Sequence, residues 1–343
     1  MNRCTYLLPI RRGAFTAPEA QEFASYFAML RTADCEVVVV DGSPEEVFSQ
    51  HSQTWRGVCR HESVDRRFGY MNDKVNGIHT GVEKSSREKI ILADDDIRYT
   101  PADVERMCAL LDEAEVVRPQ NYLSPLPWWA AMEAARMLIN RATLRIGDYP
   151  GTCAFRRSTM LRVGHYDGDV LFDNEEIIRH FAAAGASIQY AIDFFIHKRP
   201  PQHAKWKEQR PRQAYEDFGL RGKTALFASL PILMLLSALL AGFGGLLLCI
   251  VLIVLVACGV AVLGRGRGEA ANFFPAWVPA YAPLWVFERS FSTYWALYWY
   301  FRHGGYPFGD KLLTKGIGRD WVSGGRVAAE AAAQRPERED GRS

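Results

Sequence analysis

Three consecutive aspartates, Asp94, Asp95 and Asp96, follow an apolar run in the segment KIILADDDIRY. Unpaired carboxylates are costly in a protein interior, so such a cluster needs a compensating partner. Asp94 and Asp96 are two residues apart and therefore project to the same side of an extended chain. Paired carboxylates suit a hard divalent cation, Mg²⁺ or Mn²⁺, which is often shared with the phosphates of a substrate. The alternative is a solvated acidic turn before the helix that starts near Thr100.

The elements that must position these aspartates alternate between strand and helix. Helices are predicted to begin near Thr16, Ser43 and Thr100, and strands are predicted at 5–10, 36–41, 89–94, 115–123 and 186–196. This alternation predicts an α/β fold with a mostly parallel central sheet. Asp41 ends the strand EVVVVD, so we expect it at the same carboxyl edge as Asp94 and Asp96, where such sheets bind ligands. The α/β domain is predicted to span residues 1–222.

Residues 224–264 contain no charged side chain, and GFGG interrupts this run at 242–245. One membrane crossing needs about 20 apolar residues, so the segment predicts a transmembrane helical hairpin. A buried hairpin in a soluble protein is the alternative. Basic residues flank both ends of the segment, which places both ends on the cytoplasmic side. The sequence therefore predicts a multi-pass protein of the inner or cell membrane, with the α/β domain in the cytoplasm.

An aromatic segment follows at 272–303, rich in Trp and Tyr and interrupted by prolines. Trp and Tyr favour the membrane–water interface, so we expect an interfacial helix here; a third membrane helix is the alternative. Residues 304–343 are predicted to form a cytoplasmic tail that is partly disordered.

Composition argues against several classes of protein. The net charge is only +2 and no basic stripe dominates, so a nucleic-acid partner is not expected. The seven cysteines are scattered without the spacing of a zinc site or a disulfide framework, which predicts reduced thiols. The apolar part of MNRCTYLLPIRRG is too short for a secretion signal.

Several segments resemble family 2 glycosyltransferases of the GT-A fold, the nucleotide-diphospho-sugar transferases. In chain order they are Pro9 after the first strand, Asp41 in VVVVDGS, Lys74 and Gly77 in NDKVNGI, and ILADDDIRY. The resemblance covers roughly residues 4–220. It implies that Asp41 recognises the nucleotide base, that Asp94 and Asp96 hold the metal and the sugar diphosphate, and that Pro9 and Lys74 lie near the nucleotide.

The resemblance also implies a general base at the start of a helix in LFDNEEIIRH. The family has an aspartate where this chain has Asn174, so the base is expected among the neighbours Asp173, Glu175 and Glu176, with Asp173 and Glu176 favoured. The alternative is that these acids only complement the helix dipole.

A basic segment before the apolar run, QRPR, matches the start of a motif that membrane-bound members of this family carry. Gln209, Arg210 and Arg212 are thereby implied in binding the diphosphate, although Gln213 replaces the tryptophan of the motif. A basic stretch that contacts anionic lipid headgroups is the alternative.

The resemblance, together with the predicted hairpin, implies a metal-dependent, inverting hexosyltransferase. The donor is expected to be a nucleotide sugar, a UDP-sugar by preference, and the acceptor a membrane lipid at the cytoplasmic face. This layout is similar to that of ceramide glucosyltransferases and hopanoid glycosyltransferases. The rival hypotheses are transfer to a polyprenyl phosphate or a polysaccharide, and a non-catalytic membrane scaffold that retains a nucleotide-binding domain.

Overall fold

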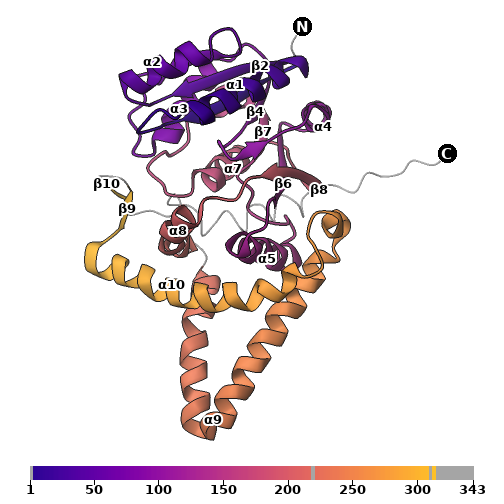
Figure 1. Ribbon diagram of the computed structural model, residues 1–343, viewed down its shortest axis with the longest axis vertical. Coiled ribbons are helices and arrows are strands. Elements are labelled where there is room, and N and C mark those ends of the chain that lie inside the picture. Colours follow the sequence, from indigo (N-terminus) through magenta and orange to yellow (C-terminus); the bar gives the residue numbers. More distant parts are fainter. Residues whose placement is uncertain (1–2, 218–220, 309–310, 314–343) are drawn as a thin grey trace, which may run out of the picture.

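The computed structural model describes residues 3–217, 221–308 and 311–313. An α/β domain forms the upper part of Figure 1, and a long bent helix forms the lower part. The strands of the central sheet are β1 (Cys4–Ile10), β2 (Cys35–Asp41), β3 (Arg60–Ser63), β4 (Lys89–Leu92), β5 (Ile97–Arg98), β6 (Val116–Leu123), β7 (Cys153–Arg156) and β8 (Ile188–Lys198). The helices of this part are α1 (Ala17–Thr32), α2 (Glu45–Thr54), α3 (Asp73–Lys84), α4 (Pro101–Glu113), α5 (Trp128–Thr143), α6 (Arg157–Val163), α7 (Asp173–Ala183) and α8 (His203–Glu216).

The sheet has the order β3-β2-β1-β4-β7-β6-β8-β5. β3, β2, β1 and β4 run parallel, whereas β7 is antiparallel to both of its neighbours. β8 is parallel to β6, and the short β5 is antiparallel to β8. The α/β prediction is therefore confirmed, and the sheet is mixed, with β5 and β7 opposed to the other strands. The carboxyl ends of β1, β2 and β4 lie side by side at one edge.

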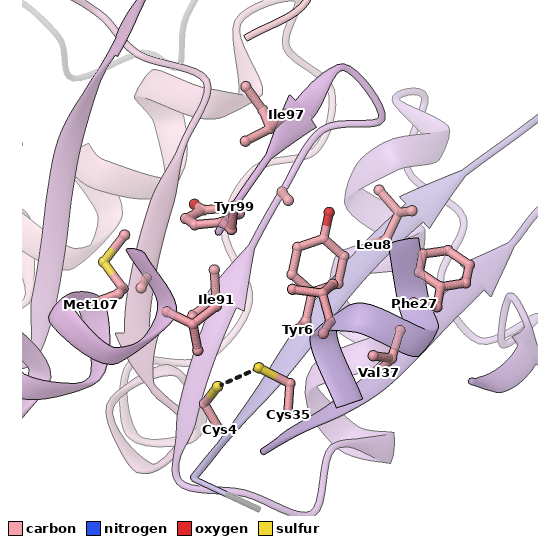
Figure 2. Close-up of a cluster of buried hydrophobic side chains, with 14 of the residues drawn as sticks. Cys4, Tyr6, Leu8, Phe27, Cys35, Val37, Ile91, Ile97, Tyr99 and Met107 are labelled. Atoms are coloured by element: carbon pink, nitrogen blue, oxygen red, sulfur yellow. Dashed lines mark hydrogen bonds between the residues drawn. The ribbon is translucent and has the colours of Figure 1, made fainter. Parts of the chain in front are cut away.

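Helices cover both faces of the sheet and bury its apolar strands. On one face, α1 and α4 pack on β1, β2 and β4, as the cluster around Tyr6, Phe27 and Met107 shows (Figure 2). On the other face, α3, α6 and α7 bury Ile78 and Phe181 against the same strands. Burial on both faces explains why β2 and β4 read as continuous apolar runs.

The C-terminal part adds helices that pack mainly on α5 and α8, with a further contact to β8 of the sheet. Its elements are α9 (Arg221–Arg265), the 3-10 helices η2 (Gly268–Asn272) and η3 (Val278–Tyr281), α10 (Ala282–His303), β9 (Tyr306–Phe308) and β10 (Lys311–Leu313). α10 lies across the upper ends of the two arms of α9 (Figure 1). β9 and β10 pair antiparallel at the start of the predicted tail; the rest of that tail lies outside the described residues.

Helix α9 bends at Ala241 and Gly242 into two arms that form a V (Figure 1). Gly242 has φ 62° and ψ −154°, a conformation that is essentially restricted to glycine. The bend falls where GFGG predicts an interruption. In the described part of the chain, one helix, Gly222–Arg265, is long and apolar enough to cross a membrane by length and composition, and an 18-residue window within it has a mean hydropathy of 3.4.

Candidate active site

The three aspartates lie in the loop between β4 and β5. β4 ends at Leu92, two residues before the predicted end, and the chain turns so that the Ile97 N–H donates to the Asp94 carbonyl oxygen at 3.1 Å. Asp95 turns away from the other two, and its Oδ2 lies 2.6 Å from Arg12 Nη2. Asp94 and Asp96 instead face a pair of lysines.

Lys74 and Lys198 supply positive charge beside these carboxylates. Lys74, in the first turn of α3, places Nζ 2.5 Å from Asp94 Oδ1 and 2.8 Å from Asp173 Oδ2. Lys198, the last residue of β8, places Nζ 3.4 Å from Asp96 Oδ2. Side chains from α3, α7, β8 and the β4–β5 loop therefore converge on one cluster, although they lie far apart in the sequence.

The two outer aspartates carry opposite pKa shifts. Burial alone would raise the pKa of Asp94, but the ammonium groups of Lys74 and Lys198 outweigh burial and hold this pKa below its ordinary value. Burial raises the pKa of Asp96, and the negative charges of Asp94 and Asp95 raise it further against the effect of Lys198. Lys198 therefore does not fully compensate for the burial of the Asp96 carboxylate and for its acidic neighbours.

The donor set of Asp94 and Asp96 fits a divalent cation. Asp96 Oδ1 is buried and has no hydrogen-bond partner among the described residues. Leaving a buried oxygen without a donor is costly, and a bound cation would supply the missing partner. Carboxylate oxygens are the ligands that Mg²⁺ and Mn²⁺ prefer. Asp94 and Asp96 are thus the residues that would hold such an ion.

The acids at the start of α7 have different environments. Asp173 faces the aspartate–lysine cluster and lines the polar chamber beside it. Glu175 forms a buried ion pair with Arg118 of β6, and Glu176 pairs with Arg179 on α7. Of the three candidates for a general base, Asp173 is the one that lies against the candidate metal ligands.

Gly151, in the loop before β7, lets the chain pass close to the cluster. A Cβ atom at this position would lie 2.7 Å from Asp94 Oδ2 and 3.3 Å from Asn174 Nδ2. Asn174 stands where the family pattern has its base, and it accepts a hydrogen bond from Lys74 Nζ at 2.7 Å. Asn174 therefore orients the lysine that links Asp94 to α7.

Pro9 and Gly77 set the position of Lys74. Pro9 is buried in β1, and a Cβ atom on Gly77 would lie 2.8 Å from Pro9 Cβ, so glycine lets α3 lie close to the strand. Asn72 caps α3 by accepting a hydrogen bond from the Lys74 N–H at 3.1 Å. Pro9 is thus placed to support the helix that carries Lys74.

Asp41 ends β2 at the same edge of the sheet. Its side chain is fully buried; Oδ1 accepts from the Ser43 N–H at 2.8 Å, and Oδ2 lies 2.7 Å from His51 Nδ1 and 3.1 Å from His61 Nε2. Burial would raise the pKa of Asp41, but hydrogen bonds from His61, Ser43 and His51 lower it to about 2. The ligand atoms of Asp41, His51 and His61 lie within 4.8 Å of one another, so this group is a second place that could hold a metal ion.

A polar chamber of about 280 Å³ extends from the aspartate–lysine cluster toward α8, α9 and α10. The lining at the cluster end includes Asp96, Asp173 and Lys198. The lining also includes the residues predicted from the basic segment on α8, Gln209, Arg210 and Arg212. The chamber therefore joins two groups of predicted site residues that are separated in sequence.

The α8 residues are held by different partners. Arg210 is buried and pairs with Glu133 of α5. Arg212 donates to the Leu171 carbonyl oxygen at 3.0 Å. Gln213, which replaces the expected tryptophan, accepts from Arg210 Nη2 at 2.7 Å. The glutamine thus takes part in the polar network of the chamber.

Sequence reasoning missed Lys198 as a site residue. The strand was expected to end at Ile196, whereas β8 continues to Lys198 and brings its ammonium group to Asp96. The available signal was a lysine at the end of an apolar strand, at the sheet edge where ligands bind. Glu133 was also missed, because nothing in its local sequence indicates that it meets Arg210 across the chamber.

No protein-family model matches the chain, and no curated protein matches it. Among solved structures, the chain is similar to the mannosyltransferase PcManGT from Pyrobaculum calidifontis in complex with GDP-Man and Mn²⁺, at 18% identity and a TM-score of 0.47 over 85% of this chain and 87% of that one. It is also similar to glucosyl-3-phosphoglycerate synthase from Mycobacterium tuberculosis, at 15% identity and a TM-score of 0.40 over 62% of this chain and 77% of that one. Both TM-scores lie below 0.5, and the functional proposal rests on this chain's own residues.

Proposed function

We propose that this protein is a metal-dependent glycosyltransferase that transfers a sugar from a nucleotide sugar to a membrane lipid. The observation that carries the proposal is the convergence of Asp94, Asp96 and Asp173 with two lysines at one end of a polar chamber. Hard-cation ligands, an acid that can take a proton, and positive charge for a leaving diphosphate are the groups that such a transfer needs.

Each residue has a role in the proposed reaction. Asp94 and Asp96 hold Mg²⁺ or Mn²⁺, which when bound neutralises charge on the donor diphosphate. Lys198, beside Asp96, adds positive charge at the same place. Asp173 accepts the proton of the acceptor hydroxyl as its oxygen attacks the anomeric carbon, and a single displacement of this kind inverts the anomeric configuration. Lys74 links Asp173 to Asp94 and keeps the base beside the diphosphate site.

The nucleotide is proposed to bind along the carboxyl edge of β1 and β2. Asp41 is the last residue of β2 at that edge, and Ser43, His51 and His61 hold its carboxylate by hydrogen bonds. Asp41 would recognise the base together with these neighbours. Pro9 supports the strand at this position. A UDP-sugar is the donor that the proposal favours.

The acceptor is proposed to be a lipid because the hairpin of α9 would place the chamber at a membrane surface. The tip of the hairpin exposes Leu239, Leu240 and Phe243, whose side chains are 72%, 86% and 79% accessible. Such a large exposed apolar surface is typical of a membrane contact. Each arm is long enough for a span of about 20 residues, which would make 224–264 a transmembrane hairpin and leave residues 1–222 as the catalytic part.

Helix α10 is proposed to lie in the membrane interface. Its exposed side chains include Phe291, Trp295, Tyr298 and Phe301, and aromatic side chains of this kind favour the headgroup region. For the segment 272–303, an interfacial helix agrees with the position of α10, which lies across the upper ends of the two arms of α9 (Figure 1). The basic residues that flank the hairpin favour a cytoplasmic catalytic domain in the inner or cell membrane.

Release of nucleoside diphosphate tests the proposal. The full chain in lipid nanodiscs that contain a total membrane lipid extract should release UDP or GDP from at least one nucleotide hexose in the presence of Mn²⁺. Asp96→Asn should lose about 100-fold or more of this activity, since it removes a proposed metal ligand. Asp95→Asn is the matched control, because Asp95 pairs with Arg12 away from the cluster. Equal rates for the two variants would contradict the metal assignment, and no release from any donor would favour a scaffold.

A further inference from the structure

Three cations meet at the end of the polar chamber nearest to the hairpin: Arg210 of α8, Lys223 of α9 and Arg289 of α10. Gln213 Oε1 accepts from Arg210 Nη2 at 2.7 Å and from Arg289 Nη2 at 3.2 Å. Asp217 contacts Arg289 Nη1 at 3.0 Å and Lys223 Nζ at 2.9 Å. Gln213 and Asp217 therefore link the three cations, and Glu133 and Glu288 lie beside Arg210.

Arg210 and Arg289 are buried, and Lys223 is half-buried. Arg289 is 2% exposed, and its Nε has no hydrogen-bond partner among the described residues. Glu133 pairs with Arg210 and with Arg136, and Arg136 also pairs with Asp148 at 2.9 Å. Glu288 lies 3.8 Å from Arg210, which is too long for a hydrogen bond.

Arg210 is buried among both acids and other arginines. Burial lowers the pKa of Arg210, while Glu133 and Glu288 oppose the repulsion from Arg289 and Arg136. The side chain of Arg212 also lines the chamber. An anion at this end could accept the unused Arg289 Nε–H.

An apolar groove of about 720 Å³ begins one helical turn from the same cations. Phe227 follows Lys223 by four residues on α9, and Trp285 precedes Arg289 by four residues on α10. Their rings pack at 5.2 Å between centroids, and both line the groove between the two arms of α9. A cationic polar site directly beside an apolar groove matches a molecule with an anionic head and a hydrocarbon tail.

We propose that the acceptor is an anionic phospholipid whose headgroup carries a free hydroxyl. An acyl chain lies in the groove between the arms of α9, the phosphate diester contacts Arg210, Lys223 and Arg289, and the headgroup hydroxyl reaches through the chamber to Asp173. This assignment rests on the proposed function, since it names the acceptor of the same site.

The geometry favours a hydroxyl nucleophile beyond the phosphate. Asp173 begins α7, the cations lie on α8, α9 and α10, and α8 lies between α7 and α10 in Figure 1. In the transfer, the hydroxyl oxygen forms a bond to the anomeric carbon and the bond from that carbon to the donor diphosphate breaks. The proton passes to Asp173, the nucleoside diphosphate leaves, and the phosphate diester of the acceptor is unchanged. A lipid monophosphate would instead present its phosphate as the nucleophile, at the opposite end from these cations.

Defined lipids test the assignment. The full chain is placed in phosphatidylcholine nanodiscs that contain phosphatidylglycerol, phosphatidylinositol, diacylglycerol, ceramide or a polyprenyl phosphate, with a labelled nucleotide hexose and Mn²⁺. Label is expected in phosphatidylglycerol or phosphatidylinositol. Faster labelling of diacylglycerol or ceramide would contradict the proposal of an anionic headgroup. Labelling of the polyprenyl phosphate instead of the phospholipids would contradict the proposal of a hydroxyl nucleophile.

Variants test the cation site itself. Arg289→Gln should raise the KM for the phospholipid about tenfold or more, and Arg289→Lys should restore part of the loss, whereas Lys205→Gln, an exposed lysine on α8, should leave the KM unchanged. Binding of UDP or GDP with Mn²⁺ reports whether the variants are folded. An unchanged KM in Arg289→Gln would overturn the headgroup site.

The acceptor assignment and the proposed function fail in different ways. Donor hydrolysis to free sugar without label in any lipid would overturn the phospholipid acceptor and leave a nucleotide-sugar enzyme. Absence of both hydrolysis and nucleoside diphosphate binding would overturn the proposed function, and the acceptor assignment with it.

Discussion

At the scale of single residues, the candidate site is a balance of three acids and two lysines. Asp94, Asp96 and Asp173 carry one more charge than Lys74 and Lys198 offset, and burial together with the neighbouring carboxylates raises the pKa of Asp96. A site with one uncompensated negative charge can bind a cation. Asp173 is the acid that the structure sets apart, because arginines hold Glu175 and Glu176.

Replacement of the proposed base should reduce turnover without loss of donor binding. Asp173→Asn is expected to lower the transfer rate about 100-fold to 10,000-fold, the usual contribution of a general base. Glu176→Gln is the matched control, since Glu176 pairs with Arg179 of the same helix. Steady-state rates of nucleoside diphosphate release with the lipid extract measure the difference. A normal rate for Asp173→Asn would remove this residue from the mechanism.

The buried carboxylate of Asp41 should make stability depend on pH. Its pKa falls from 3.8 to about 2 in the folded chain, so its stabilising effect is complete above pH 3.8 and is lost as pH falls through about 2. Asp41→Asn should therefore lower the free energy of unfolding by about 2 kcal/mol at pH 7. The gap from the wild type should close between pH 4 and pH 2.

Denaturant unfolding across this pH range provides the measurement. Asp95→Asn is the control, because a partly exposed pair such as Asp95–Arg12 contributes about 1 kcal/mol or less. A gap that stayed constant down to pH 2 would contradict the shifted pKa.

At the scale of elements, individual strands and helices could be predicted from local patterns, whereas contacts between distant elements could not. The apolar runs of β1, β2 and β4 and the capping box at Thr100 identify their elements directly. The antiparallel direction of β7 and the extension of β8 to Lys198 depend on pairing between distant strands, which no local pattern encodes. Asp94 and Asp96 could be singled out by their spacing, whereas Lys198 could be placed only by the sheet.

The bend in α9 depends on one glycine. At φ 62° and ψ −154°, Gly242 adopts a conformation that costs other residues about 1 to 3 kcal/mol. Gly242→Ala should therefore lower thermal stability in detergent. Gly244→Ala is the matched control, because a Cβ atom there meets no described atom within 4 Å and φ is not positive. Equal melting temperatures for the two variants would contradict the bend at Gly242.

At the scale of the whole molecule, one chamber connects an α/β domain to an apolar hairpin. The sequence indicates both parts separately, through the strand pattern and through the run at 224–264. The connection could not be predicted, because it consists of contacts between α5, α8, α9 and α10 that bring Glu133, Arg210 and Arg289 together. In the proposed function, recognition of the acceptor would depend on that junction, which no single sequence motif specifies.

The central claim is that Asp94 and Asp96 hold a divalent ion together with a nucleoside diphosphate, and calorimetric binding of UDP and GDP to the full chain tests it most directly. With Mn²⁺ present, at least one of the two nucleotides should bind, and removal of the ion with a chelator should weaken binding about tenfold or more. Asp96→Asn should lose the same metal dependence, and Asp95→Asn should keep it. Binding that is identical with and without Mn²⁺, or identical in Asp96→Asn and the wild type, would contradict the claim.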